Sequence, residues 1–169
     1  MKGFIPGGRA MADEKGCNSS FHCLSDNIMK IYSIGHSNRR EEDFINLLKQ
    51  YRIEIVIDVR RFPTSKYVTY KKENLTELLK KNGIEYVHLE NLGGYRGGYE
   101  KWMCSKEWKR DYERLKEIAM NKRAAIMCAE KLPFRCHRRY IARKLAADGW
   151  KVIHIINEKV WEEKSSVKL

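Results

Sequence analysis

The stretch Glu54-Ile55-Val56-Ile57-Asp58 decides the fold class. Its three consecutive β-branched residues leave no polar face, which is typical of a strand that is covered on both sides, as in a parallel sheet. Other short apolar segments along the chain have the length of strands and are separated by longer segments. We therefore expect further strands over 31–34, 85–89, 124–128 and 151–155.

Amphipathic segments alternate with these strands. The spacing of apolar residues predicts helices over 41–51, 72–81, 105–120 and 138–148. Asn38 is expected to cap the first helix, with Glu41 as its capping-box partner. Strands that alternate with helices predict a three-layer α/β domain, with a mostly parallel sheet of about five strands and helices on both faces.

Length and composition are those of one compact domain. The chain has 169 residues, and its 43% hydrophobic content excludes a disordered chain. No apolar run approaches the roughly 20 residues of a membrane span. Five irregularly spaced cysteines do not resemble the disulfide framework of a secreted protein. We expect a cytoplasmic protein with reduced thiols and no membrane partner.

The folded pattern begins abruptly at Met29. Residues 1–28 lack periodicity and are expected to be a flexible extension, a cloning remnant or an over-long gene start. The spacing Cys17-x4-His22-Cys23 matches no strong zinc pattern, so no metal or cofactor is predicted. The single domain is expected over 29–157, with a polar tail over 158–169.

The chemically versatile side chains follow the predicted strands. In an open parallel sheet, ligands bind in the crevice beyond the carboxyl ends of the strands. The loops after the first four strands should therefore converge on one edge. Their candidate segments are 35–37, 58–65, 91–99 and 128–139.

The charge balance favours acidic partners. The chain carries 34 Lys and Arg residues against 22 Asp and Glu residues, a net charge of +12. We expect nucleic acid, a nucleotide or another phosphorylated ligand as partner. A basic surface without a specific partner is the alternative, and the sequence does not define the oligomeric state.

The fourth loop and the helix after it carry the densest positive charge. Residues 131–144 include six Lys or Arg residues and no acid. Cations at the amino end of a helix oppose its dipole, so this arrangement predicts a bound phosphate-like anion. In the alternative interpretation, Arg138 or Arg139 pairs with Glu130 or Asp58 as scaffolding.

Cys128 ends a predicted strand and Cys136 precedes a helix. A thiol beside cations and a helix amino end has a lowered pKa and is more nucleophilic. The layout resembles that of cysteine-dependent phosphatases and rhodanese-type sulfurtransferases, although a Leu-Pro-Phe segment at 132–134 replaces their tight loop. A redox pair, a metal site with His137 and buried structural cysteines are the alternatives.

Basic and aromatic residues interleave in the second loop. Residues 60–72 include five basic side chains and no acid. Single-stranded nucleic acid requires such neutralised phosphates and stacking surfaces, although the aromatic rings would alternatively pack onto the domain. The candidates for stacking are Phe62, Tyr67, Tyr70 and, in the third loop, Tyr95.

Four motifs together resemble the domain of unknown function 488 family: Ser33-Ile34-Gly35-His36-Ser37, Asp58-Val59-Arg60, Leu92-Gly93-Gly94, and Cys128-Ala129-Glu130-Lys131 through Cys136-His137-Arg138. The resemblance covers about residues 30–155. It implies a small α/β protein, and no biochemical activity follows from it. The positions that the family shares are His36, Ser37, Asp58, Arg60, Ser65, Cys128, Glu130, Cys136, His137 and Arg138.

These observations predict a protein that binds nucleic acid or a nucleotide at the carboxyl edge of its sheet, and they do not decide whether it is an enzyme. A cysteine-dependent transferase or hydrolase acting on a small anion and a non-catalytic interaction module are the alternatives. The catalytic candidates are His36, Asp58, Glu130 and Cys128. The ligand-binding candidates are Ser37, Arg60, Ser65, Arg96, Lys131, Arg135, Cys136, His137, Arg138 and Arg139.

Overall fold

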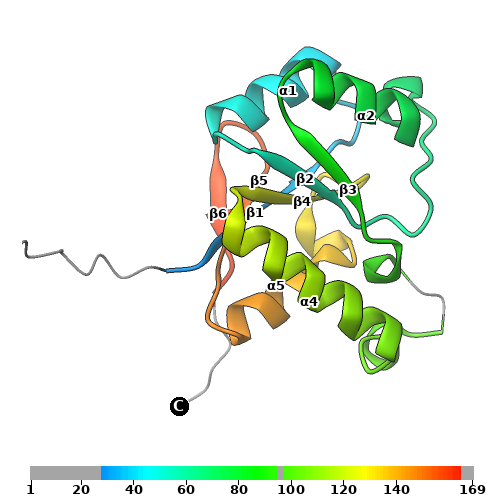
Figure 1. Cartoon of the computed structure of the whole chain (residues 1–169), viewed down its shortest axis with the longest axis vertical. Helices are drawn as coiled ribbons and strands as arrows, with labels where there is room; N and C mark the ends of the chain where they lie inside the picture. The colour runs from blue at the N-terminus through cyan, green and yellow to red at the C-terminus, as the bar shows by residue number, and fades with distance from the viewer. Residues whose placement is uncertain (1–27, 95–96, 165–169) are drawn as a thin grey trace, which may run out of the picture.

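A twisted six-stranded sheet forms the centre of the molecule (Figure 1). The computed structural model describes residues 28–94 and 97–164, and the strand order within them is β3-β2-β4-β1-β5-β6. Every neighbouring pair is parallel except β5 and β6. The strands are β1 (Lys30–Gly35), β2 (Ile55–Asp58), β3 (Glu85–His88), β4 (Ala124–Cys128), β5 (Lys151–Ile155) and β6 (Val160–Glu162).

Helices cover both faces of the sheet, which confirms the predicted three-layer α/β class (Figure 1). Helices α1 (Glu41–Gln50) and α2 (Lys72–Lys81) lie on one face. Helices α4 (Lys106–Asn121) and α5 (Arg138–Ala147) lie on the other. Shorter helical turns interrupt the loops: η1 (Val68–Tyr70), η2 (Glu90–Leu92), α3 (Tyr99–Trp102) and η3 (Pro133–Arg135).

Alternation along β2 explains its apolar sequence. Val56 packs into the core under α1 and α2, whereas Ile55 and Ile57 pack into the core under α4 and α5. All three side chains are buried because each face of the sheet has its own layer of helices.

Helix α1 begins at Glu41 as predicted, but its capping residue differs from the sequence prediction. Asn38 was expected to cap this helix, but the capping position is Arg40, and no side chain caps it. A tight turn follows β1, in which Ser37 adopts a φ of 48° and the Arg39 N–H donates to the His36 carbonyl over 3.0 Å. Because this turn occupies the residues before Arg40, Asn38 lies two positions upstream of the capping position.

The end of the chain also differs in part from expectation. Within the segment 158–169, expected as a polar tail, Val160–Glu162 form β6 and pair antiparallel with β5. Residues 1–27, including Cys17, His22 and Cys23, lie outside the described residues, as do Tyr95 and Arg96. Within the described part of the chain, no helix has the length and apolar character needed to cross a membrane.

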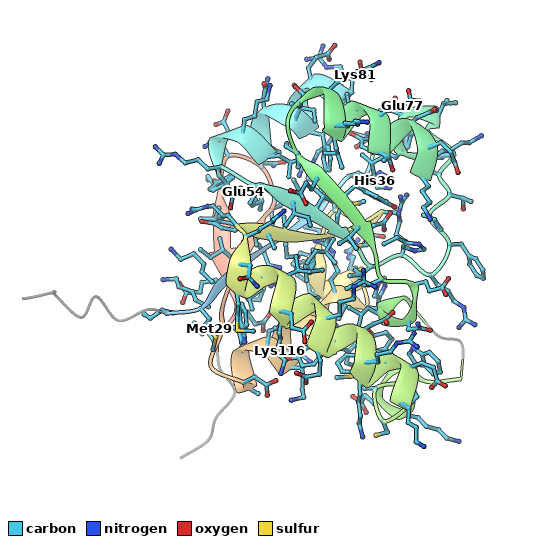
Figure 2. All side chains as sticks on the ribbon, in the orientation of Figure 1. Met29, His36, Glu54, Glu77, Lys81 and Lys116 are labelled. Atoms are coloured by element: carbon cyan, nitrogen blue, oxygen red, sulfur yellow. The ribbon has the colours of Figure 1, made fainter. Side chains whose placement is uncertain are left out.

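The chain leaves β1 and β4 toward opposite faces of the sheet. β1 continues into α1 on one face and β4 into α5 on the other, although the two strands are neighbours. Where neighbouring parallel strands lead to helices on opposite faces, a crevice opens at the carboxyl ends of the strands, and ligands bind in this crevice. In Figure 2, His36 lies at this end of the sheet, whereas Met29 and Glu54 lie at the opposite end.

Gly35 provides a test of how tightly the two strand ends approach each other. A Cβ atom at Gly35 would lie 1.9 Å from the Glu130 carbonyl oxygen, so Gly35→Ala forces the backbone apart. We expect a loss of about 1–3 kcal/mol in the free energy of unfolding, measured by urea denaturation. Gly94→Ala is the control, because its Cβ would meet only the His137 ring at 3.7 Å; equal losses would contradict the prediction.

Candidate functional site

A pocket of about 500 Å³ opens beside the divergence of β1 and β4. Its walls come from three of the four loops that the sequence analysis selected. The loop after β1 contributes residues 36–38, the loop after β2 contributes 64–67, and the end of β4 contributes Ala129 and Glu130. The lining combines hydroxyl, amide, imidazole and carboxylate groups with one lysine and one tyrosine.

A buried ion pair shapes the second of these loops. Asp58, at the end of β2, is fully buried, and its carboxylate accepts hydrogen bonds from Arg60 Nε at 2.9 Å and Arg60 Nη2 at 2.6 Å. The Tyr86 hydroxyl donates to the same carboxylate over 2.8 Å. Arg60 Nη1 also donates to the carbonyls of Thr64 and Tyr70, so the guanidinium holds both ends of the loop.

His36 forms the floor of the pocket as a neutral imidazole. Burial lowers its pKa from 6.5 to about 4, with Arg60 and Arg138 acting in the same direction. Its Nδ1 donates to the Ser37 carbonyl over 2.9 Å, which leaves the Nε2 lone pair facing Arg60 Nη1 at 3.4 Å. The ring stacks on Tyr70 with centroids 4.1 Å apart, and Tyr70 is therefore buried.

The aromatic residues of the second loop divide into two groups. Tyr70 belongs to the core, where its hydroxyl donates to the Arg39 carbonyl. Phe62, by contrast, is 71% exposed and Tyr67 37% exposed. A cation lies over each exposed ring, Arg61 over Phe62 and Lys66 over Tyr67. The exposed rings are thus available at the surface, and the buried ring is not.

The two predicted cysteines meet on the α5 side of the sheet. Their sulfur atoms lie 2.8 Å apart, with Cys128 buried and Cys136 half-buried. Arg138 Nε donates to Cys128 Sγ over 3.0 Å, and the Glu130 N–H donates to the same sulfur over 3.3 Å. The Arg138 N–H, at the start of α5, donates to Cys136 Sγ over 3.4 Å.

Arg138 is buried beneath the loop that follows β4. Besides Cys128, its guanidinium contacts Ser33 Oγ at 2.8 Å and the backbone carbonyls of Glu130 and Lys131. Among the described residues no ion pair joins it to a carboxylate. The predicted anion at this helix start stays a prediction.

Two histidines fix the backbone between the pocket and the cysteines. His137 Nε2 donates to the Val59 carbonyl over 2.8 Å, and His88 Nε2 donates to the Arg60 carbonyl over 2.7 Å. His137 Nδ1 lies 3.6 Å from Cys136 Sγ. The described residues include no cluster of three His, Cys, Asp or Glu side chains arranged to hold a metal ion.

The remaining basic candidates surround this region. Arg135 is exposed and Lys131 is half-buried. Arg139 donates to the Phe134 carbonyl and lies over the Tyr140 ring, and the Ser65 hydroxyl accepts from the Tyr67 N–H. The structure therefore brings His36, Ser37, Ser65, Tyr67 and Glu130 together at the pocket, and Cys128, Cys136, His137 and Arg138 together behind it.

Several residues of the site escape the sequence argument. Tyr86 and Ser33 complete the hydrogen bonding of Asp58 and Arg138, and Asn38, Thr64 and Lys66 line the pocket. Ser33 carries a signal that could have identified it, because a polar residue in the middle of a buried strand needs a hydrogen-bond partner. Tyr86 carries no such signal, since its role depends on its position beside β2.

Breaking the buried ion pair should lower the free energy of unfolding substantially. Asp58→Ala leaves the Arg60 guanidinium buried without its counterion, so we expect a loss of about 3–5 kcal/mol in the free energy of unfolding. Asp43→Ala removes the exposed partner of Arg40 and should cost less than about 1 kcal/mol. Chemical denaturation of both variants checks this, and similar losses would refute the role given to the buried pair.

The neutral state of His36 makes stability depend on pH. Between pH 6.5 and about 4 the unfolded chain takes up a proton at this residue that the folded protein does not. His36 therefore does not reduce the free energy of unfolding above pH 6.5. On acidification below pH 6.5 it lowers the free energy of unfolding by up to about 1.4 kcal/mol per pH unit. Urea denaturation across this range measures it. His36→Gln should show a shallower slope, and an unchanged slope would disprove the assignment.

Comparison with known proteins completes the description of the site. A search of curated proteins finds no match to the chain. Residues 40–145 match the family model described as domain of unknown function DUF488. The matched range contains the Asp58–Arg60 ion pair and the two cysteines. His36 and Ser37 lie just before the matched range. Because the match covers more than half of the chain, the protein belongs to the DUF488 family.

Proposed function

We propose that this protein binds single-stranded nucleic acid at the carboxyl edge of its sheet. The observation that carries the proposal is that the basic loop after β2 forms part of the lining of the pocket. Residues 64–67 of that loop line the pocket, with the partly exposed ring of Tyr67 among them, and Phe62 exposes its ring two residues before Thr64 in the same loop. Stacking surfaces next to cations are the two requirements of sequence-tolerant strand binding.

The charges of the pocket indicate which part of a nucleotide would enter it. Glu130 and Lys66 both line the pocket, so its charged groups balance and it does not favour a phosphate. Ser37, Asn38 and Ser65 offer hydrogen-bonding groups suited to a base edge or a sugar hydroxyl. We assign the base or sugar to the pocket.

The phosphates would lie outside the pocket on accessible cations. Lys66 and Arg135 are exposed, and the net charge of +12 attracts a polyanion from a distance. Arg60 and Arg138 are buried, with their donors directed at protein atoms, so the proposal assigns them to positioning the loops. This division follows from the hydrogen bonds of each guanidinium.

Fluorescence anisotropy with labelled single-stranded DNA, RNA and duplex DNA tests the proposal. We expect micromolar or tighter binding of single strands, weakening steeply with salt because neutralised phosphates release counterions. Lys66→Ala should reduce the slope of log K against log salt by about one. Lys81→Ala is its matched control, because Lys81 projects outward from α2, away from the site (Figure 2). Absence of binding at low salt would refute the proposal.

The aromatic contribution needs a separate variant. Phe62→Ala should weaken single-strand binding by about 1–3 kcal/mol, since base stacking on an aromatic ring has this value. Met120→Ala removes a large apolar side chain from α4 that is 61% exposed, and it should leave binding unchanged. If the two variants bind alike, the ring of Phe62 does not stack on a base.

A further inference from the structure

The contact between Cys128 and Cys136 has chemistry that nucleic-acid binding does not use. Two sulfur atoms 2.8 Å apart share a hydrogen bond, and a covalent bond between them requires an approach of less than about 1 Å. The two residues lie eight positions apart, at the end of β4 and just before α5. The fold itself therefore holds the pair together.

The surroundings of the pair favour one thiolate. The hydrogen bond with Cys128 lowers the pKa of the Cys136 thiol well below its usual range, with His137 and Arg138 acting in the same direction. Burial raises the pKa of the Cys128 thiol. The pair therefore shares a single proton, and the thiolate balances the charge of buried Arg138.

The same contacts argue against an external oxyanion at this place. A phosphatase-like loop needs its arginine to face the bound anion. In this protein, Nε and both terminal nitrogens of Arg138 donate to Cys128, Ser33 and the carbonyl of Glu130. The positive charge is directed at sulfur, so the cluster is built around the cysteines themselves.

We propose that Cys136 and Cys128 form a redox-active dithiol site whose substrates are disulfides. The half-buried Cys136 is the attacking residue and the buried Cys128 is the resolving residue. Arg138 is a positioning residue that keeps both sulfurs together and stabilises the thiolate. The site lies on the other side of β4 from the pocket, and its chemistry does not require nucleic-acid binding.

The reaction proceeds in two exchanges. Cys136 thiolate attacks one sulfur of a disulfide R–S–S–R, forming a Cys136–S–S–R bond and releasing R–S⁻. Cys128 then gives its proton to the released thiolate and attacks Cys136 Sγ, which expels a second R–S⁻. The two cysteine sulfurs are oxidised by two electrons, the substrate disulfide is reduced to one R–SH and one R–S⁻, and the total charge is unchanged.

Reaction with dithiodipyridine, an aromatic disulfide whose released thiol is coloured, tests the proposal. The full-length protein carries Cys17→Ser, Cys23→Ser and Cys104→Ser, so the pair is the remaining source of thiols. We expect two released thiols per chain and an intact mass lower by two hydrogen atoms, restored by dithiothreitol. A single stable adduct, or no reaction of the native protein, would overturn the proposal.

Two serine variants in the same background identify the roles. Cys128→Ser should release one thiol and retain a stable adduct on Cys136, because the resolving sulfur is missing. Cys136→Ser should react at least about tenfold more slowly at about pH 6, where an ordinary thiol is almost fully protonated. Equal rates for the two variants would show that Cys136 is not the activated thiol and would refute the assignment of attacker. If a variant does not fold, the released-thiol count and mass of the parent protein still decide the proposal.

Exposed Cys104 provides the reference for reactivity. A parallel protein retains Cys104 and carries serine at the other four cysteines, so that its rate is that of an unactivated thiol. The dithiol protein should react at least about tenfold faster than this reference at about pH 6. A slower reaction, together with one adduct per chain, would identify the pair as structural.

Discussion

The candidate site depends on one buried ion pair, that between Asp58 and Arg60. Burying two charges is costly unless they meet with good geometry and their remaining donors are used. Here Tyr86 and the carbonyls of Thr64 and Tyr70 complete the set. Because Arg60 bonds to both ends of the loop after β2, the pair determines where that loop runs. The wall of the pocket and the exposed rings beside it follow from this arrangement.

A second buried arginine, Arg138, also carries a charge that is costly to bury, and its partners are different. Arg138 lies on the opposite side of β4 from the pocket, and its Nε donates to Cys128 Sγ rather than to a carboxylate of the described residues. The backbone of Glu130 belongs to both environments, since its N–H and carbonyl contact the Cys128–Arg138 cluster while the residue lines the pocket. Arg138 therefore holds a backbone segment that also lines the pocket, whereas Arg60 holds the facing loop after β2.

The fold followed from local patterns, whereas much of the site did not. The bounds predicted for α2, β4 and β5 match the structure, because apolar runs and the turn at Gly83 mark them clearly. β6 was missed, since its three residues are exposed and pair only because β5 has a free edge. The loops that follow the predicted strands were identified from sequence, and three of these four loops line the pocket. The sequence did not yield every side-chain partner, because the contacts of Arg138 with Ser33 and of Asp58 with Tyr86 join segments that are distant along the chain.

The position of β1 in the sheet has a consequence for how the chain acquires its structure. β1 precedes the other described strands along the chain, yet its neighbours are β4 and β5, with Tyr32 beside Ala125 on one side and beside Ile153 on the other. β1 therefore stays unpaired until β4 has been synthesised, and its pairing closes a long loop. A chain truncated before β4 would lack both neighbours of this strand, whose last five residues are buried in the folded protein.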